Sequence, residues 1–258
     1  MKKIYFQLSL LSLISNPILA IERLNSGCTE VAQFVKKYLP ENPVIFEAGC
    51  YDALDTKIMA NFWPNSIIHA FEPIPSLYNH CKWATQDNKN INIYPLALSD
   101  KIGTATFYVS EYVWSPGNPG ASSSLLEPHE HIDRERHVVF PQQITVNTIT
   151  INSWAKENNI SHIDLMWLDM QGHELTALKA ANNILHKVKL IYTEVEFVKA
   201  YKNQALYKDV KAWLALQGFR VLALDFDENH GLRDDIPVGE QYYGNALFIN
   251  EKYYPQTN

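Results

Sequence analysis

The length, composition and charge of the chain exclude several classes of protein. Its 258 residues, 47% of them hydrophobic, are enough for one sizeable buried core. The formal net charge of -6 provides no positive field to attract phosphates, so we expect a small-molecule or glycan partner and no nucleic acid. The three cysteines, Cys28, Cys50 and Cys81, lack the spacing of a zinc site or a disulfide framework, which predicts ordinary thiols.

Residues 1–20 differ in composition from the rest of the chain. Two lysines precede an apolar run over residues 4–14, and Ala20 can end a cleavage site. This pattern is typical of a secretory signal and is short for a membrane span, with a buried first helix as the alternative. We therefore expect a signal-like or membrane-proximal segment over residues 1–20, with residues 4–19 as a tether, and one domain over residues 21–258.

From residue 29 onward, helical patterns alternate with short runs of branched apolar residues. In chain order, the first half predicts a helix over 29–39, a strand over 44–47, a helix over 54–63, a strand over 66–71, a helix over 76–85 and a strand over 91–97. The second half predicts a helix over 151–158, a strand over 163–169, a helix over 173–185, a strand over 190–196, a helix over 206–217 and strands over 219–224 and 246–250. This alternation predicts an α/β, Rossmann-like fold, in which a mostly parallel sheet of seven strands carries helices on both faces.

The region between these halves departs from the alternation. Two strand-like runs, 104–109 and 138–149, flank a stretch over residues 111–136 that is rich in Pro, Gly and Ser. A loop of this length in a compact domain is usually functional or disordered. We expect this loop to lie over a bound cofactor, as a lid or a substrate loop.

The first predicted strand leads into a turn at Gly49, where a ligand can approach the backbone closely. A dinucleotide fingerprint needs glycine at three positions, which here hold Glu47, Gly49 and Asp52, so two of the three fail. The two acids repel a pyrophosphate but attract the sulfonium and ammonium groups of S-adenosylmethionine. We therefore expect a site for this methyl donor that includes Cys50 and Tyr51, with an ordinary tight turn as the alternative.

The second predicted strand ends in Glu72 and Pro73. Glu72 follows Glu47 by 25 positions, close to the spacing of the acidic residue that binds ribose hydroxyls in Rossmann-type sites. Pro73 makes the chain leave the strand sharply. We expect both residues in the cofactor site, although a single acid at the end of a strand is often simply solvated.

A third cluster follows the predicted strand over 163–169. Asp169 lies at the end of this strand, and His173 and Glu174 begin the next helix. Since ligands bind at the carboxyl ends of parallel strands, we expect Asp169 and His173 to be catalytic residues. The alternative is that the polar groups of this segment only satisfy the start of the helix.

The following strand carries Glu194 and Glu196 on one face, because residues two apart point to the same side of a strand. We include Glu196 among the candidate catalytic residues, with an ion pair to a lysine as the alternative for one of the two. Carboxylates of Asp169, Glu194 and Glu196 suit Mg²⁺. The sequence does not establish a metal site, and we predict no metal ligand.

These clusters, in this order and spacing, resemble the FkbM-type methyltransferase family over residues 43–250. Residues 47–49 resemble the first cofactor motif of the family, residues 71–73 the second, and residues 168–174 its hallmark segment. The resemblance implies an enzyme that uses S-adenosylmethionine to O-methylate a hydroxyl group of a sugar, a glycan or a related natural product.

Two further segments extend the resemblance. Residues 97–100 resemble the segment that lines the adenine, which implies that Ala97 and Ser99 contact the cofactor, and residues 123–125 resemble a Ser-Ser-Leu segment of the central loop. Three positions depart from the family pattern: Ala53 replaces a common glycine, Gln171 a common glutamate and Trp167 a frequent lysine. The last two changes concern the catalytic base and the acceptor more than the cofactor.

Methyl transfer is an in-line displacement, so the enzyme mainly has to hold an oxygen close to the methyl group and aligned with it. The hydroxyl group must also lose a proton, for which Asp169, His173 or Glu196 can act as general base. We favour Asp169. The alternatives are an NAD-dependent oxidoreductase or epimerase on the same fold, and a non-catalytic module that binds a glycan or a protein.

The N-terminal pattern and the cofactor point to different compartments. A secretory signal indicates export, whereas S-adenosylmethionine is supplied in the cytosol. The cofactor therefore favours a catalytic domain in the cytoplasm or on the cytoplasmic face of a membrane. The sequence alone leaves the oligomeric state open.

Overall fold

The computed structural model describes residues 21–25, 27–226 and 242–255. The predicted signal-like segment over residues 1–20 therefore lies outside the described residues. Among the helices in the described part of the chain, none combines the length and the apolar character needed to cross a membrane.

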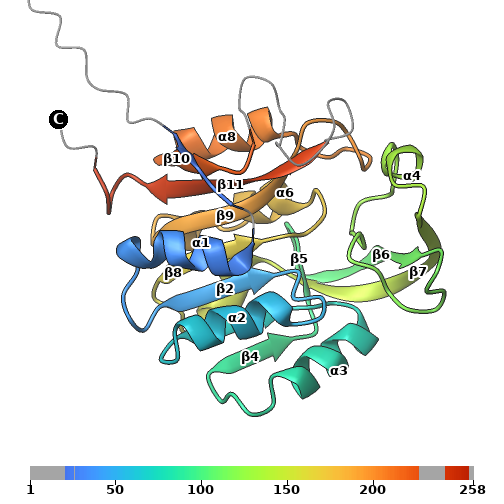
Figure 1. Cartoon of the computed structure of the whole chain (residues 1–258), viewed down its shortest axis with the longest axis horizontal. Helices are drawn as coiled ribbons and strands as arrows, with labels where there is room; N and C mark the ends of the chain where they lie inside the picture. The colour runs from blue at the N-terminus through green and yellow to red at the C-terminus, as the bar shows by residue number, and fades with distance from the viewer. Residues whose placement is uncertain (1–20, 26, 227–241, 256–258) are drawn as a thin grey trace, which may run out of the picture.

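Over the described residues, the main sheet has eight strands in the order β1-β10-β11-β9-β8-β2-β3-β4 (Figure 1). All neighbours are parallel except β11, which is antiparallel to both β9 and β10. The seven predicted strands are present, and the two-residue strand β1 adds an eighth at the edge. The strands are β1 (Glu22–Arg23), β2 (Val44–Ala48), β3 (Ile67–Phe71), β4 (Ile91–Tyr94), β8 (Ile163–Leu168), β9 (Val188–Glu196), β10 (Phe219–Leu224) and β11 (Tyr243–Asn250).

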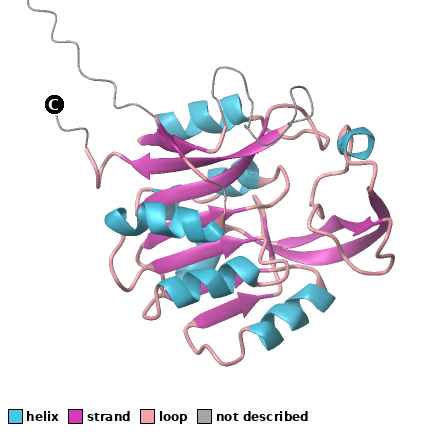
Figure 2. Ribbon diagram, in the orientation of Figure 1, coloured by secondary structure: helices cyan, strands magenta, loops and turns pink. Residues whose placement is uncertain are grey.

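Helices cover both faces of this sheet (Figure 2). On β2, Ile45 belongs to a buried cluster with Met59, whereas the next residue, Phe46, belongs to a second cluster with Trp154. This alternation is what a strand buried on both faces requires. One face carries α1 (Cys28–Val35), which continues as a 3-10 turn (Lys36–Tyr38), α2 (Leu54–Phe62) and α3 (Pro75–Ala84). The other carries α5 (Ile151–Glu157), α6 (Glu174–Lys179), α7 (Asn182–Leu185) and α8 (Tyr207–Leu216).

Two predicted elements are interrupted. The strand predicted over residues 91–97 divides into β4 and β5 (Ala97–Leu98), since Pro95 between them has no N–H to donate to a sheet. The helix predicted over residues 173–185 divides into α6 and α7. The side-chain oxygen of Asn152, on α5, accepts hydrogen bonds from the backbone N–H groups of Asn183 (3.0 Å) and Ile184 (3.3 Å) and so starts a separate helix there.

A second sheet has the order β5-β7-β6, with β6 (Gly103–Tyr112) antiparallel to β7 (Val138–Ile149). Together with α4 (His131–Arg134), the ends of β6 and β7 extend to the right of the main sheet in Figure 1. The stretch over residues 111–136 is therefore not a loop throughout: β6 continues to Tyr112, and α4 forms within it. Ser124 pairs with Tyr108 on β6, which holds the rest of the stretch against the second sheet.

Candidate functional site

Strand order reverses between the central strands β2 and β8, because the chain continues from β2 toward one edge of the sheet and from β8 toward the other. In open α/β sheets, a crevice forms at the carboxyl ends of the strands at such a point. The turns after β2, β3 and β8 meet there. They hold Gly49, Glu72 and Asp169, each in the turn after its strand.

The turn after β2 brings the backbone of two strands together at Gly49. This residue has a φ of 89°, and a Cβ atom here would overlap the carbonyl oxygen of Asp169. The N–H groups of Gly49 and Cys50 both donate to the carbonyl of Phe71 (3.1 Å each). Only glycine fits this position, since it needs both a left-handed conformation and the absence of a side chain.

Two other residues of this turn adopt left-handed conformations without being glycine. Tyr51 has a φ of 49°, and Ala53, the N-terminal cap of α2, has a φ of 61°. Such a conformation costs a residue with a Cβ about 1–2 kcal/mol. The preference for glycine at the position of Ala53 in the resembling family therefore has a backbone explanation in this chain.

Glu47 lies at the base of the turn, 1% exposed, and accepts a hydrogen bond from the hydroxyl of Thr56 (2.6 Å). Burial raises the pKa of its carboxyl group well above the ordinary value, and the nearby Cys50 adds to the effect, whereas the hydrogen bond from Thr56 opposes it. The carboxyl group is thus a buried acceptor whose charge depends on what binds beside it.

Glu72 accepts hydrogen bonds from two backbone N–H groups, those of Tyr51 (3.0 Å) and Ile74 (2.9 Å). It therefore connects the turn after β3 to the turn after β2. Burial raises the pKa of Glu72 to about 7, although both hydrogen bonds stabilise the charged form. Each carboxylate oxygen retains a second lone pair, which a ligand can use.

These turns enclose a first cavity of about 300 Å³. Of the predicted cofactor-binding residues, all but Ser99 line it: Glu47, Gly49, Cys50, Tyr51, Asp52, Glu72, Pro73 and Ala97. Ser99 lies behind the wall, with its hydroxyl 3.2 Å from Nε2 of His173. The predicted lid also contributes, since Gly120, Ala121, Ser123 and Leu125 complete the lining.

His173 lines the first cavity as the N-terminal cap of α6. Burial lowers the pKa of its imidazole to about 4, although the charge of Asp100 acts in the opposite direction. The ring is therefore neutral at pH 7. Its Nδ1 atom is buried and has no hydrogen-bond partner among the described residues.

Asp169 lines the first cavity and also a second one, of about 260 Å³. The side-chain amide of Gln171 donates to the carboxylates of both Asp169 (2.8 Å) and Glu194 (2.7 Å). Removal from bulk water raises the pKa of Glu194 well above its ordinary value, and the charges of Asp169 and Glu196 add to the shift. Desolvation likewise raises the pKa of Asp169, although its hydrogen bond from Gln171 opposes this.

Gln171 is itself held in a strained conformation, with a φ of 53°. Its carbonyl accepts a hydrogen bond from the hydroxyl of Ser124 (2.9 Å), and its side-chain oxygen accepts one from the hydroxyl of Tyr201 (3.0 Å). The amide therefore has a fixed orientation in which its N–H groups face the two acids. A glutamate here would instead add a third carboxylate to this group.

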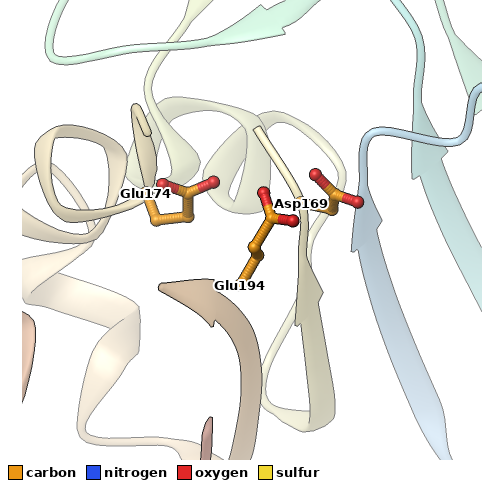
Figure 3. A group of neighbouring side chains, drawn as sticks. All are labelled: Asp169, Glu174 and Glu194. Carbon is orange, nitrogen blue, oxygen red and sulfur yellow. The ribbon is translucent and has the colours of Figure 1, made fainter. Parts of the chain in front are cut away.

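Figure 3 shows Asp169, Glu174 and Glu194, whose carboxylates can supply ligand atoms within 4.8 Å of one another. Oxygen ligands of this kind suit Mg²⁺. Protein donors already use these groups, however. Glu174 accepts hydrogen bonds from the backbone N–H groups of Met170 (2.7 Å) and Gly172 (3.3 Å). The side-chain amide of Gln171 donates to the carboxylates of the other two acids, Asp169 and Glu194.

The third predicted catalytic residue, Glu196, lines only the second cavity. Four acids and four tyrosines dominate that cavity: Glu135, Asp169, Glu194, Glu196, Tyr112, Tyr201, Tyr242 and Tyr243. Among the described residues that line it, none is a lysine or an arginine. The structure thus places Asp169 between the two cavities, with His173 on one side and Glu196 on the other.

Sequence reasoning did not identify Tyr201 or the role of Gln171. Tyr201 follows the end of β9 in a stretch without periodicity, and only the contact with Gln171 reveals its position. Trp167, whose departure from the family pattern suggested a changed substrate site, is 6% exposed and packs on Tyr192 with ring centroids 4.1 Å apart. That departure therefore concerns core packing.

Comparison with known proteins identifies a family. A model described as the methyltransferase FkbM domain matches residues 52–221. A 2-O-methyltransferase, NoeI, of Sinorhizobium fredii is 28% identical over 176 residues, which is 68% of this chain and 70% of that protein.

Solved structures with a similar fold share little sequence with the chain. The N-terminal domain of EvdMO1, crystallised in the presence of SAH and D-fucose, has a TM-score of 0.48 at 9% identity, over 88% of this chain and 83% of that one. TrmK of M. capricolum in complex with SAH has a TM-score of 0.47 at 12% identity, over 88% of this chain and 71% of the other. Values this low carry no information on function.

Proposed function

The chain belongs to the FkbM methyltransferase family, and we propose that it transfers a methyl group from S-adenosylmethionine to a hydroxyl group of a sugar, a glycan or a related natural product. The observation that carries this proposal is the position of Asp169, which lines two adjoining cavities. One cavity has the features of a cofactor site and the other those of an acceptor site.

The first cavity fits S-adenosylmethionine in shape and in charge. Gly49 lines the cavity without a side chain of its own, and Glu72 offers free lone pairs to ribose hydroxyl groups. Glu47 and Asp52 provide acidic groups for the ammonium and sulfonium charges. When bound there, the cofactor supplies a methyl group on a positively charged sulfur atom.

The second cavity suits an uncharged, hydroxyl-rich acceptor. Its carboxylates accept hydrogen bonds from hydroxyl groups, and these acids, with no lysine or arginine among the described lining residues, disfavour phosphates and carboxylates on the substrate. The relative from Sinorhizobium fredii is named a 2-O-methyltransferase, which supports oxygen as the attacked atom in this chain too.

In this proposal, Asp169 takes the proton from the attacking hydroxyl group. It stands between the cavities, and its exposed carboxylate can accept a proton from a hydroxyl group that reaches it. Gln171 orients the carboxylate by its hydrogen bond. His173, neutral and on the cofactor side, positions the ligand in the first cavity, whereas Glu196 binds acceptor hydroxyls.

A turnover assay with methyl-labelled cofactor tests this assignment. The chain is incubated with a panel of neutral sugars and oligosaccharides, and the labelled product is identified. We expect Asp169→Asn to lower kcat by about 100-fold or more with unchanged affinity for the cofactor. Asp87→Asn, at an exposed position on the surface, serves as the matched control and leaves kcat unchanged. Normal turnover by Asp169→Asn contradicts the role of this residue.

The family match selects methyl transfer over the nicotinamide-dependent reaction that the fold alone permits. It also favours an enzyme over a non-catalytic module. A protein that binds the cofactor but labels no member of the panel would restore the latter alternative.

A further inference from the structure

Three aromatic rings stack on one another at the end of the second sheet. Trp114 lies parallel to Tyr112 (centroids 5.1 Å apart, 9° between planes) and to His137 (5.2 Å, 16°). Tyr112 and His137 are themselves nearly parallel (7°). We call these three residues the aromatic platform. Trp114 is 67% exposed, so its large apolar surface serves no purpose in a buried core.

The backbone and a contact with Glu135 hold the aromatic platform in place. Tyr112 is the last residue of β6 and pairs with Val138 on β7, and the N–H of Val113 donates to the carbonyl of His137 (2.9 Å). Nε2 of His137 lies 3.2 Å from the carboxylate of Glu135. The ring orientations are thus set before any ligand arrives, which reduces the entropy lost on binding.

The aromatic platform continues into the second cavity. Tyr112 and His137 line this cavity together with Asp169 and Glu194. Trp114, which stacks on both, extends the same surface outward into solvent. A ligand whose reacting group lies at Asp169 therefore meets these rings where it leaves the cavity.

A sugar ring suits this surface. One face of a pyranose carries mainly C–H groups, which pack on the electron-rich face of an aromatic ring, while its hydroxyl groups project from the edges. The edges can then bond to the carboxylates of the neighbouring cavity. An acyl chain or a protein side chain of apolar character would instead place apolar groups among Glu135, Glu194 and Glu196.

We propose that the aromatic platform binds a sugar unit next to the one that is methylated, so that the natural acceptor is an oligosaccharide or a larger glycan. This inference rests on the proposed function, because it places the methylated unit in the second cavity. It adds a binding subsite centred on Trp114 and predicts a preference for acceptors longer than one sugar.

The test measures glycan binding separately from catalysis. The protein, saturated with S-adenosylhomocysteine, is applied to an array of glucose, galactose, mannose and N-acetylglucosamine and their neutral oligosaccharides. We expect oligosaccharides to be retained more tightly than monosaccharides. Trp114→Ala should weaken the best oligosaccharide about tenfold, the loss of one aromatic stacking contact, and Trp114→Phe should restore most of it.

The control is a second exposed tryptophan. Trp83, on α3, is 65% exposed and does not line either cavity, so Trp83→Ala should bind every glycan as the unaltered protein does. Trp114→Gln repeats the disruption in case the alanine variant fails to fold. Binding of S-adenosylhomocysteine should be the same in all variants, because the aromatic platform does not line the first cavity.

The outcomes separate the inference from the proposed function. Equal oligosaccharide binding by the unaltered protein and Trp114→Ala overturns the inference, as does an array on which no glycan is retained. Methyl transfer to monosaccharides without any preference for longer chains rejects the subsite but keeps the proposed function. Retention that depends on Trp114 without any methyl transfer supports sugar binding at the aromatic platform but rejects the proposed function, and with it the methylated unit as the neighbour of the bound sugar.

Discussion

At the scale of single residues, the turns around the first cavity contain several residues in left-handed conformations. Gly49 and Gly172 have φ values of 89° and 92°, and the neighbouring turns also contain Tyr51, Ala53 and Gln171 at positive φ. Strained conformations persist only where the surroundings enforce them, and they concentrate at functional sites. Here they bring the turns after β2 and β8 into contact.

Gly49→Ala tests the contact between the two turns. We expect it to lower the free energy of unfolding by about 3 kcal/mol or more, because the new Cβ both strains the backbone and overlaps the carbonyl of Asp169. Gly218 has a similar φ of 84° but open space around it, so Gly218→Ala should cost only about 1 kcal/mol. Denaturant titration measures both values. Equal losses would show that the overlap has no energetic effect.

The pKa of Glu72 predicts how the affinity for the cofactor depends on pH. Its pKa of about 7 means that the free protein gains a proton here as the pH falls through neutrality. Ribose hydroxyl groups donate to the charged carboxylate, so this proton must leave on binding. We expect the Kd for S-adenosylmethionine to rise about tenfold for each pH unit below this pKa.

Calorimetric titration from acidic to mildly alkaline pH measures this dependence. Glu72→Gln removes the titrating group, so it should bind more weakly and lose the dependence on pH in this range. If the Kd of the variant depended on pH to the same extent, the effect would belong to another titrating group, such as Glu47.

At the scale of helices and strands, periodicity in the sequence was sufficient to predict the elements but not their interruptions. Branched apolar runs predicted the core strands because a strand buried on both faces must be apolar on both. The break at Pro95 was visible as a residue without an N–H, whereas the break between α6 and α7 depends on Asn152, 31 positions before Asn183. Contacts between residues so far apart leave no periodic pattern.

The residues of the candidate site likewise divide into those that the sequence predicts and those that it does not. Glu47, Glu72 and Asp169 were predictable because each lies within one residue of the end of a core strand, and the strand ends of an α/β sheet converge. The second cavity was not predictable, since Tyr112, Tyr201 and Tyr242 reach it from three separate parts of the chain. The assignment of Glu196 to the side away from the cofactor also required the three-dimensional arrangement.

Asn152 provides the test at the element scale. Asn152→Ala removes the acceptor for the first N–H groups of α7, so we expect the free energy of unfolding to fall by about 1 kcal/mol. Asn152→Asp keeps an acceptor oxygen and should retain most of the stability. Urea denaturation measures both variants, and cofactor affinity should not change, because Asn152 lines neither cavity. No loss in Asn152→Ala would mean that packing alone defines α7.

At the scale of the whole molecule, the two sheets form different parts of the two cavities. The main sheet brings the turns of the first cavity together, and the second sheet carries the predicted lid and part of the wall of the second cavity. Asp169 belongs to both cavities, so a ligand bound in one lies next to a ligand bound in the other. This adjacency is the geometric requirement for in-line transfer between two bound molecules.

The most direct test of the account is calorimetric titration of the purified chain with S-adenosylmethionine and, separately, with NAD. An acidic first cavity with a glycine turn should bind the positively charged methyl donor with one molecule per chain and show no heat with the diphosphate. Tight binding of NAD together with no detectable binding of S-adenosylmethionine would contradict the account.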